Sequence, residues 1–150
     1  MTTVLADARL GVVVADSSIS DGDRQWRGRK VFRVGGDIVA FSGAVDEGMM
    51  FVDWLRKGAQ AAKKPKLSSG RFQGLVLNTH GLFSFQYDLL LPVPVECGFE
   101  AIGSGGKAAM CAYEALGFTD PKRAVQIVCK HDAGSRAPVR VYHLKKHEPT

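Results

Sequence analysis

The sequence predicts an antiparallel α+β fold built in layers. Two observations indicate it: strand-like segments come in pairs joined by short turns, and segments with helical spacing of apolar residues lie between groups of strands. The order along the chain is strands, one helix, strands, two helices and a final strand. This order is typical of helices that cover antiparallel sheets.

Three strand pairs are expected to form hairpins. The first joins a strand at 3–8 to a short buried strand at 12–15 through a turn at 9–11. The second joins 30–34 to 37–41 through Gly35-Gly36, a pair suited to the positive backbone angles of a two-residue turn. The third joins 72–77 to 82–87, and Pro92 and Pro94 then interrupt any further ladder.

Three helices and two further strands complete the predicted elements. The first helix follows Gly43, is capped by Asp46 and extends to about Ala62. After a strand at 100–102, Ser104 caps a second helix that runs to about Leu116. A third starts at Asp120-Pro121, a cap followed by proline at the first helical position, and a strand at 139–144 ends the fold. We expect one domain over residues 1–150.

Composition narrows the class of protein. No apolar run approaches the roughly 18 residues of a membrane span, and the first residues lack the pattern of a signal peptide, so we expect a cytoplasmic protein with no membrane contact. The three cysteines, Cys97, Cys111 and Cys129, have no metal-site spacing and are expected to be buried, reduced thiols. No metal site or cofactor is predicted.

The net charge of +5 leaves open a small basic nucleic-acid binder. The basic residues form two modest clusters, one over 24–30 and one over 63–66. No aromatic residues or binding motif accompany the second cluster, and a solvated loop explains it better. Nucleic-acid binding is therefore the less favoured alternative.

We expect three chemical groups to meet at the hairpin ends if the first two hairpins share one sheet. If Gly35-Gly36 is the turn, Lys30 lies opposite Phe41, and Lys30 and Gly43 share one open end of the hairpin. The first hairpin returns Asp16 to the neighbourhood of Thr2. A hydroxyl near the terminus, a carboxylate and a lysine beside a backbone turn are a set that acyl transfer uses.

Thr2 follows the initiator methionine. Removal of Met1 would place a free α-amine on the same residue as the hydroxyl, and an amine with an unperturbed pKa of about 7.7 to 8 can act as a general base near neutral pH. Thr2 is therefore a candidate nucleophile that needs no histidine.

Several motifs together resemble the proteasome β-subunit and HslV family of N-terminal-nucleophile hydrolases. Each motif alone is weak, but their order and spacing are specific, and they span most of the chain. They are Thr2-Thr3, the run 11–16, Lys30-Val31, Phe41-Ser42-Gly43, the run 101–106, and His131-Asp132 with Ser135 followed by 141–144.

The resemblance implies an αββα sandwich of antiparallel sheets and a threonine-type peptidase that acts through an acyl-enzyme. By position, Thr2 resembles the nucleophile, Lys30 the catalytic lysine and Asp16 the acid paired with it. Gly43 resembles the glycine whose N–H serves the oxyanion hole. The residues that resemble those holding the terminal amine are Ser104, Asp132 and Ser135. Thr3 is a neighbour to which no chemical step is assigned.

Each residue also has a purely structural explanation. Ser104 can be a helix cap, Asp16 a turn former, Lys30 an exposed strand residue and Gly43 a bend before the helix. Singly, each of these explanations is the better one. Jointly they would require several independent positions to match the family order by chance, so the catalytic interpretation is preferred.

One departure from the family pattern concerns the helices. Only about ten residues separate the first helix from the next strand, so a second central helix is expected to be short or missing. The resemblance implies peptide or unfolded-protein substrates, a homo-oligomer of unspecified size and an ATP-dependent unfoldase as a possible partner. A non-catalytic assembly subunit with the same fold remains the alternative function.

Overall fold

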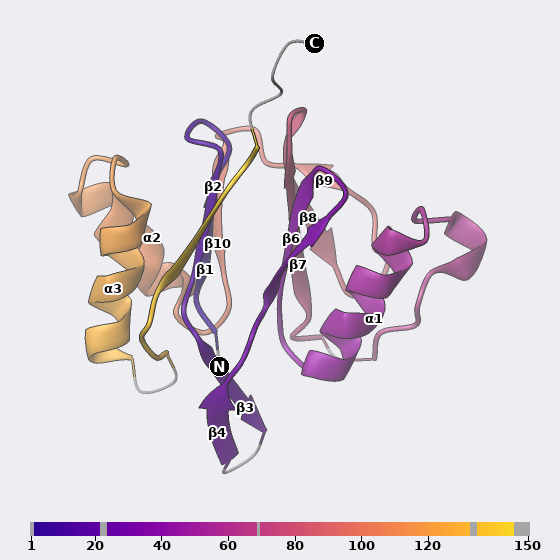
Figure 1. Ribbon diagram of the computed structural model, residues 1–150, viewed down its shortest axis with the longest axis horizontal. Coiled ribbons are helices and arrows are strands. Elements are labelled where there is room, and N and C mark those ends of the chain that lie inside the picture. Colours follow the sequence, from indigo (N-terminus) through magenta and orange to yellow (C-terminus); the bar gives the residue numbers. More distant parts are fainter. Residues whose placement is uncertain (1, 22–23, 69, 133–134, 146–150) are drawn as a thin grey trace.

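The computed structural model describes residues 2–21, 24–68, 70–132 and 135–145. Two antiparallel sheets lie face to face, with helices α2 and α3 on the outer side of one sheet and helix α1 on the outer side of the other (Figure 1). The predicted α+β class with two antiparallel sheets is confirmed. The chain begins at one end of the two sheets (Figure 1).

The first sheet has the order β10-β1-β2-β11. Its strands are β1 (Val4–Asp7), β2 (Val12–Ala15), β10 (Phe99–Ile102) and β11 (Arg140–His143). The predicted first hairpin is confirmed, because Val4 pairs with Ala15 and Asp7 with Val12. Every residue of β1 and β2 is buried, as expected for central strands covered on both faces.

The second sheet has the order β5-β6-β7-β8-β9. Its strands are β5 (Val31–Val34), β6 (Asp37–Ser42), β7 (Gln73–Asn78), β8 (Gly81–Gln86) and the short edge strand β9 (Val93–Pro94). Val34 pairs with Asp37 across the Gly35-Gly36 turn, so the predicted register of the second hairpin is confirmed. A separate hairpin, β3 (Ser18–Asp21) with β4 (Arg24–Arg27), was not predicted.

Helix α1 spans Val45–Arg56, six residues shorter than predicted. The chain leaves the helix at Lys57, and Gly58 then takes a positive φ of 93°. The predicted cap is also wrong: Ala44 occupies the cap position without a side-chain bond, and Asp46 lies in the first turn. There its negative carboxylate interacts favourably with the positive end of the helix dipole. A 3₁₀ turn, Ala61–Lys63, follows.

Helices α2 (Gly106–Ala115) and α3 (Pro121–His131) pack against each other and against the first sheet. The predicted start of α3 is confirmed: the Asp120 side chain accepts a hydrogen bond from Arg123 N, and Pro121 is the first helical residue. For α2 the cap residue is Gly105, and the predicted cap Ser104 is used elsewhere. No helix in the described part of the chain is long and apolar enough to cross a membrane.

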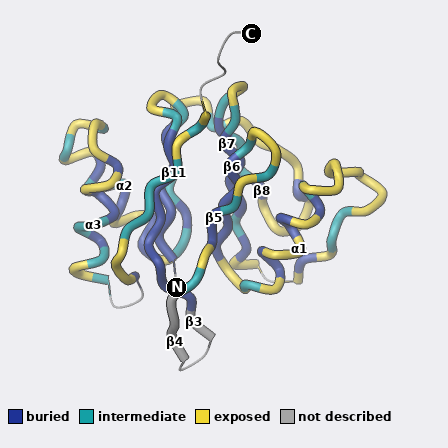
Figure 2. Tube along the Cα trace, viewed as in Figure 1, coloured by how far each residue is buried: buried dark blue, intermediate teal, exposed yellow. Residues whose placement is uncertain are grey.

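The core has three parts that follow the layers. One lies between the two sheets, one between the second sheet and α1, and one between the first sheet and α2 and α3. Strand alternation separates them: Val4 faces the other sheet, whereas Leu5 faces the helices. The buried strands and exposed outer helix faces are visible in Figure 2.

The cysteine prediction is wrong for two of the three residues. Cys97 and Cys111 are exposed, and Cys129 on α3 is partly buried. Burial, together with nearby Asp16 and Asp132, raises the pKa of the Cys129 thiol to about 11. The sequence did not distinguish the exposed cysteines from the partly buried one, because polar and apolar residues are mixed in the sequence around all three.

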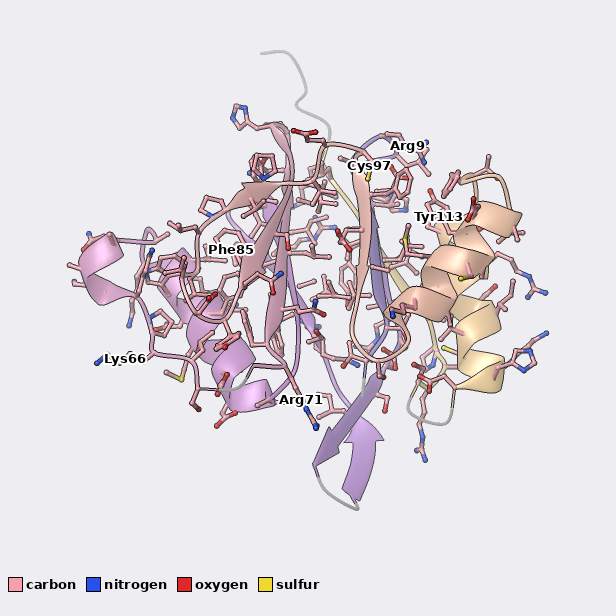
Figure 3. All side chains as sticks on the ribbon, turned by 180° about the vertical axis from the view of Figure 1, so that it is seen from behind. Arg9, Lys66, Arg71, Phe85, Cys97 and Tyr113 are labelled. Carbon is pink, nitrogen blue, oxygen red and sulfur yellow. The ribbon has the colours of Figure 1, made fainter. Side chains whose placement is uncertain are left out.

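A buried carboxylate, Asp7, anchors the end of the first sheet that lies away from the N-terminus. Arg9 binds it through two nitrogens, with Nη2 at 2.6 Å from Oδ2 and Nε at 3.1 Å from Oδ1. The hydroxyl of Tyr113 on α2 donates to Oδ2 as well. Arg9 and Tyr113 are labelled at this end of the first sheet in Figure 3. Burial alone would raise the pKa of Asp7, but the hydrogen bonds from Arg9 and Tyr113 outweigh it, so the pKa is lowered.

Tyr113→Phe should lower the free energy of unfolding by about 1–3 kcal/mol, because a buried carboxylate oxygen loses a donor. Urea denaturation at pH 7 measures this difference. Tyr87→Phe, at a 37% exposed tyrosine, is the matched control and should change stability by less than about 0.5 kcal/mol. Equal effects of the two substitutions would contradict the assignment.

The same cluster predicts a pH dependence. Asp7 has a lower pKa in the folded state, so its stabilisation is complete above the unfolded value of 3.8 and is lost as the pH falls through the folded value. The variant Asp7→Asn should therefore show a weaker loss of stability than the wild type between pH 5 and about pH 2, measured by urea denaturation along this range.

Candidate active site

Thr2 lies directly before β1, at the end of the gap between the two sheets. It is only 5% exposed. Strand alternation points its side chain the same way as that of Val4, towards the second sheet, and points Thr3 towards the helices. The hydroxyl of Thr2 therefore meets groups from the other sheet.

Lys30 is the group that reaches Thr2 from the second sheet. It precedes β5, and Phe41 N donates to Lys30 O at 3.1 Å, so the predicted pairing of Lys30 with Phe41 is confirmed. Its Nζ donates to Thr2 Oγ1 at 2.8 Å and to Asp16 Oδ1 at 3.0 Å. The structure thus brings together the three residues for which acyl-transfer chemistry was expected. The expected reason is wrong, however: the two hairpins do not share a sheet, and the groups meet because the two sheets face each other.

Asp16 follows β2 and is completely surrounded by donors. Besides Lys30, its Oδ1 accepts from Thr3 N at 2.9 Å. Its Oδ2 accepts from Ser18 N and Arg136 N, each at 3.1 Å. The side chain has no exposed surface, and these bonds replace the water that a buried carboxylate loses.

The buried position changes the acid–base behaviour of Lys30. Its side chain is 3% exposed, and burial lowers the pKa of the ammonium group although Asp16 acts in the opposite direction. The pKa of Lys30 is therefore closer to physiological pH than the pKa of an exposed lysine. The ammonium group donates to the hydroxyl of Thr2 while Asp16 holds it.

The loop after β10 holds the main chain of Thr2. Ser104 Oγ accepts from Thr2 N at 3.3 Å, and Gly105 N donates to Thr2 O at 3.2 Å. Ser104 is thus not a helix cap. Gly103 has a φ of +90°, and a Cβ there would lie 2.0 Å from Thr2 O, so this close approach requires glycine.

Asp132 and Ser135 flank the end of α3. Ser135 Oγ donates to Asp132 Oδ2 at 2.6 Å and lies 2.7 Å from Thr3 Oγ1. The structure therefore brings both residues to the start of β1, but the hydroxyl of Ser135 contacts Thr3, one residue beyond the position that was expected. Their action on a terminal amine stays a prediction.

Gly43 directly follows β6, at the same end of the sheet as Lys30. Its φ is +106°, a backbone conformation that favours glycine, and a Cβ would make a tight contact of 3.1 Å with Phe72 Cα. The predicted placement beside Lys30 agrees with the strand register. The role of its N–H in an oxyanion hole stays a prediction.

The sequence did not indicate Gln73, the first residue of β7. Its Oε1 accepts from Gly103 N at 3.4 Å, a contact from the second sheet to the loop that holds Thr2. No motif marks this residue, because the contact depends only on how the two sheets face each other. Met1 lies outside the described residues, so its predicted removal is not addressed by the geometry.

Lys30→Met should lower the free energy of unfolding by about 3 kcal/mol, because the carboxylate of Asp16 would stay buried without its cation. Lys57→Met is the matched control. Lys57 also pairs with an aspartate, at 3.0 Å, but its side chain is 70% exposed, and the loss should stay below about 1 kcal/mol. Urea denaturation of both variants at pH 7 measures the difference, and similar losses would contradict the argument.

Comparison with known proteins supports the architecture. No protein-family model and no curated protein matches the sequence. The structure is similar to BPH, the β-proteasome homologue of Thiobacillus denitrificans, in complex with epoxomicin: the TM-score is 0.70 at 19% sequence identity, and the match covers 97% of this chain and 100% of that one. A structure described as BPH alone gives a TM-score of 0.71 at 19% identity, covering 96% and 99%.

A eukaryotic HslV from Trypanosoma brucei is similar as well. The TM-score is 0.68 at 20% identity, and the match covers 94% of this chain and 98% of that one. At such identities the likeness establishes the arrangement of the chain and not its chemistry. The chain therefore has the fold of the proteasome β-subunit and HslV group of N-terminal-nucleophile hydrolases.

Proposed function

We propose that this chain is a threonine-type peptidase that hydrolyses peptide bonds through an acyl-enzyme on Thr2 after removal of Met1. The observation that carries the proposal is the contact of Lys30 Nζ with Thr2 Oγ1 at 2.8 Å, supported by the buried Asp16 at 3.0 Å from the same nitrogen. A buried lysine that donates a hydrogen bond to a hydroxyl can activate that hydroxyl as a nucleophile.

In the proposed reaction, Thr2 Oγ attacks the carbonyl carbon of the scissile peptide bond while its own α-amine accepts the hydroxyl proton. The N–H of Gly43 stabilises the resulting oxyanion. Collapse of this intermediate breaks the C–N bond, and the α-ammonium group gives its proton to the leaving amine. Water then hydrolyses the ester on Thr2 and regenerates the hydroxyl.

The other residues hold these groups in place. The charge of Lys30 favours the deprotonated form of the hydroxyl, and Asp16 fixes Lys30. Ser104 orients the nitrogen of Thr2, and Asp132 and Ser135 are proposed to act on the same amine once Met1 is gone. The contact of Ser104 Oγ with Thr2 N at 3.3 Å supports this arrangement.

The wider biology is proposed from the fold. One domain over 1–150, an αββα sandwich with a reduced second central helix, would form a homo-oligomer in the cytoplasm and degrade peptides or unfolded proteins, with an ATP-dependent unfoldase as a possible partner. The described residues between α1 and β7 hold only a 3₁₀ turn, which supports the reduced helix.

A peptide epoxyketone should add once to the wild-type protein, because its two-point reaction needs an amine and a hydroxyl on one residue. BPH of Thiobacillus denitrificans, the similar structure, was solved in complex with epoxomicin. Intact-mass measurement of the untagged protein should show loss of one methionine before incubation and one adduct after it. Thr2→Ala should form no adduct and have no peptidase activity.

Thr2→Ser is the matched control, because it keeps both the amine and the hydroxyl. It should form the adduct and keep measurable turnover. Thr2→Ala should unfold at a similar urea concentration to the wild type. Wild-type activity in Thr2→Ala, or retained Met1 with no adduct, would contradict the proposal and favour a non-catalytic assembly subunit.

The proposed base predicts the pH profile. An amine must be unprotonated to accept the hydroxyl proton, so kcat/KM should rise tenfold per pH unit below the amine pKa and level off above about 8. Measurement of kcat/KM from pH 5.5 to 9 checks this. A flat profile across pH 6 to 8 would exclude the α-amine as the base.

A further inference from the structure

The hydroxyl of Thr3 lies one residue from the proposed nucleophile, and no step of the proposed reaction uses it. The residue is fully buried, with 0% exposed surface. Its side chain points to the helix side of the first sheet, opposite to that of Thr2. There Oγ1 lies 2.7 Å from Ser135 Oγ, and Ser135 Oγ lies 2.6 Å from Asp132 Oδ2.

The direction of these hydrogen bonds follows from the number of protons. A hydroxyl has one proton, and Ser135 donates its proton to the Asp132 carboxylate. Ser135 must then accept from Thr3, so Thr3 is the donor. The result is a chain from Thr3 through Ser135 to a carboxylate, and a carboxylate acceptor strengthens such a chain.

The main chain of Thr3 is fixed by a different set of groups. Thr3 N donates to Asp16 Oδ1 at 2.9 Å, and Asp16 N donates to Thr3 O at 3.1 Å. Asp16 also holds Lys30. Thr3 therefore joins two supports, the Asp16–Lys30 pair through its backbone and the end of α3 through its side chain.

The space around Thr3 leaves little freedom for its hydroxyl. A Cβ on Gly105 would lie 1.9 Å from Thr3 Oγ1, and Gly105 N donates to the carbonyl of Thr2. A shift of the Thr3 side chain would thus move the contact that holds Thr2. Since β1 begins here, the same shift would change the position of Thr2 relative to Lys30.

We propose that Thr3 is a positioning residue for the reaction on Thr2: its buried hydroxyl, 2.7 Å from Ser135, ties the start of β1 to the end of α3 and so sets the placement of the nucleophile. This proposal rests on the proposed function. It assigns to Ser135 and Asp132 a structural link to Thr3 in addition to any contact with the terminal amine.

Thr3→Val keeps the shape of the side chain and removes the hydroxyl. We expect kcat for a fluorogenic peptide to fall about 10- to 100-fold, because misplacement of a reacting group by about 1 Å has effects of this size. KM should change less than about twofold, since no substrate contact is removed. Thr3→Ser, which restores the hydroxyl, should keep kcat within about threefold of the wild type.

The double variant Thr3→Val/Ser135→Ala tests the link itself. If both residues act through one chain, the double variant should lose about as much kcat as the more affected single variant, and not the product of the two losses. Thr119→Val is the matched control: it removes an exposed threonine hydroxyl that donates to the Leu116 carbonyl at 2.8 Å, and kcat should not change.

The variants are measured only after the wild type has formed its epoxyketone adduct on Thr2. If the adduct is missing, the proposed function is wrong, and the inference about Thr3 is overturned with it. Given the adduct, wild-type kcat in Thr3→Val, multiplicative losses in the double variant, or no rescue by Thr3→Ser would each overturn the inference alone. If Thr3→Val does not fold, Thr3→Ala replaces it with the same expected results.

Discussion

The buried ion pair between Lys30 and Asp16 is the interaction on which the candidate site depends. The two residues come from different sheets, so the pair joins the sheets at the end where Thr2 lies. A buried pair is stable only if its remaining polar atoms are also satisfied. Asp16 meets this condition through three backbone N–H groups, and Lys30 meets it through the hydroxyl of Thr2. The environment that stabilises the charges therefore also orients the hydroxyl.

Close packing around Thr2 explains the glycine at position 103. The chain before β1 is held from one side by Asp16 and from the other by the 103–105 loop, which approaches the Thr2 carbonyl too closely for any side chain at position 103. The loop that holds Thr2 is thus fixed by the backbone contact of Gly105 N with the Thr2 carbonyl together with the side chains of Ser104 and Gln73.

The opposite end of the first sheet is stabilised by a separate polar cluster. Asp7, Arg9 and Tyr113 connect the β1–β2 turn to α2, and the aromatic rings of Phe99, Tyr113 and Phe118 pack beside them. The two ends of β1 thus depend on different buried carboxylates, Asp16 and Asp7. A change at one end can be measured without removing the support at the other.

The sequence by itself determined the α+β class and the three predicted hairpins, because turn residues and strand alternation act over a few residues. It anticipated that Thr2, Asp16 and Lys30 meet, but from hairpins in one shared sheet, whereas the packing of two separate sheets brings them together. It misplaced the caps at Asp46 and Ser104, since a polar residue near a helix start satisfies the cap pattern wherever its side chain points. It could not indicate Gln73 or the contact of Thr3 with Ser135. These contacts join residues 30 and 132 positions apart, and they exist only because the packing of the layers brings those strands and helix ends together.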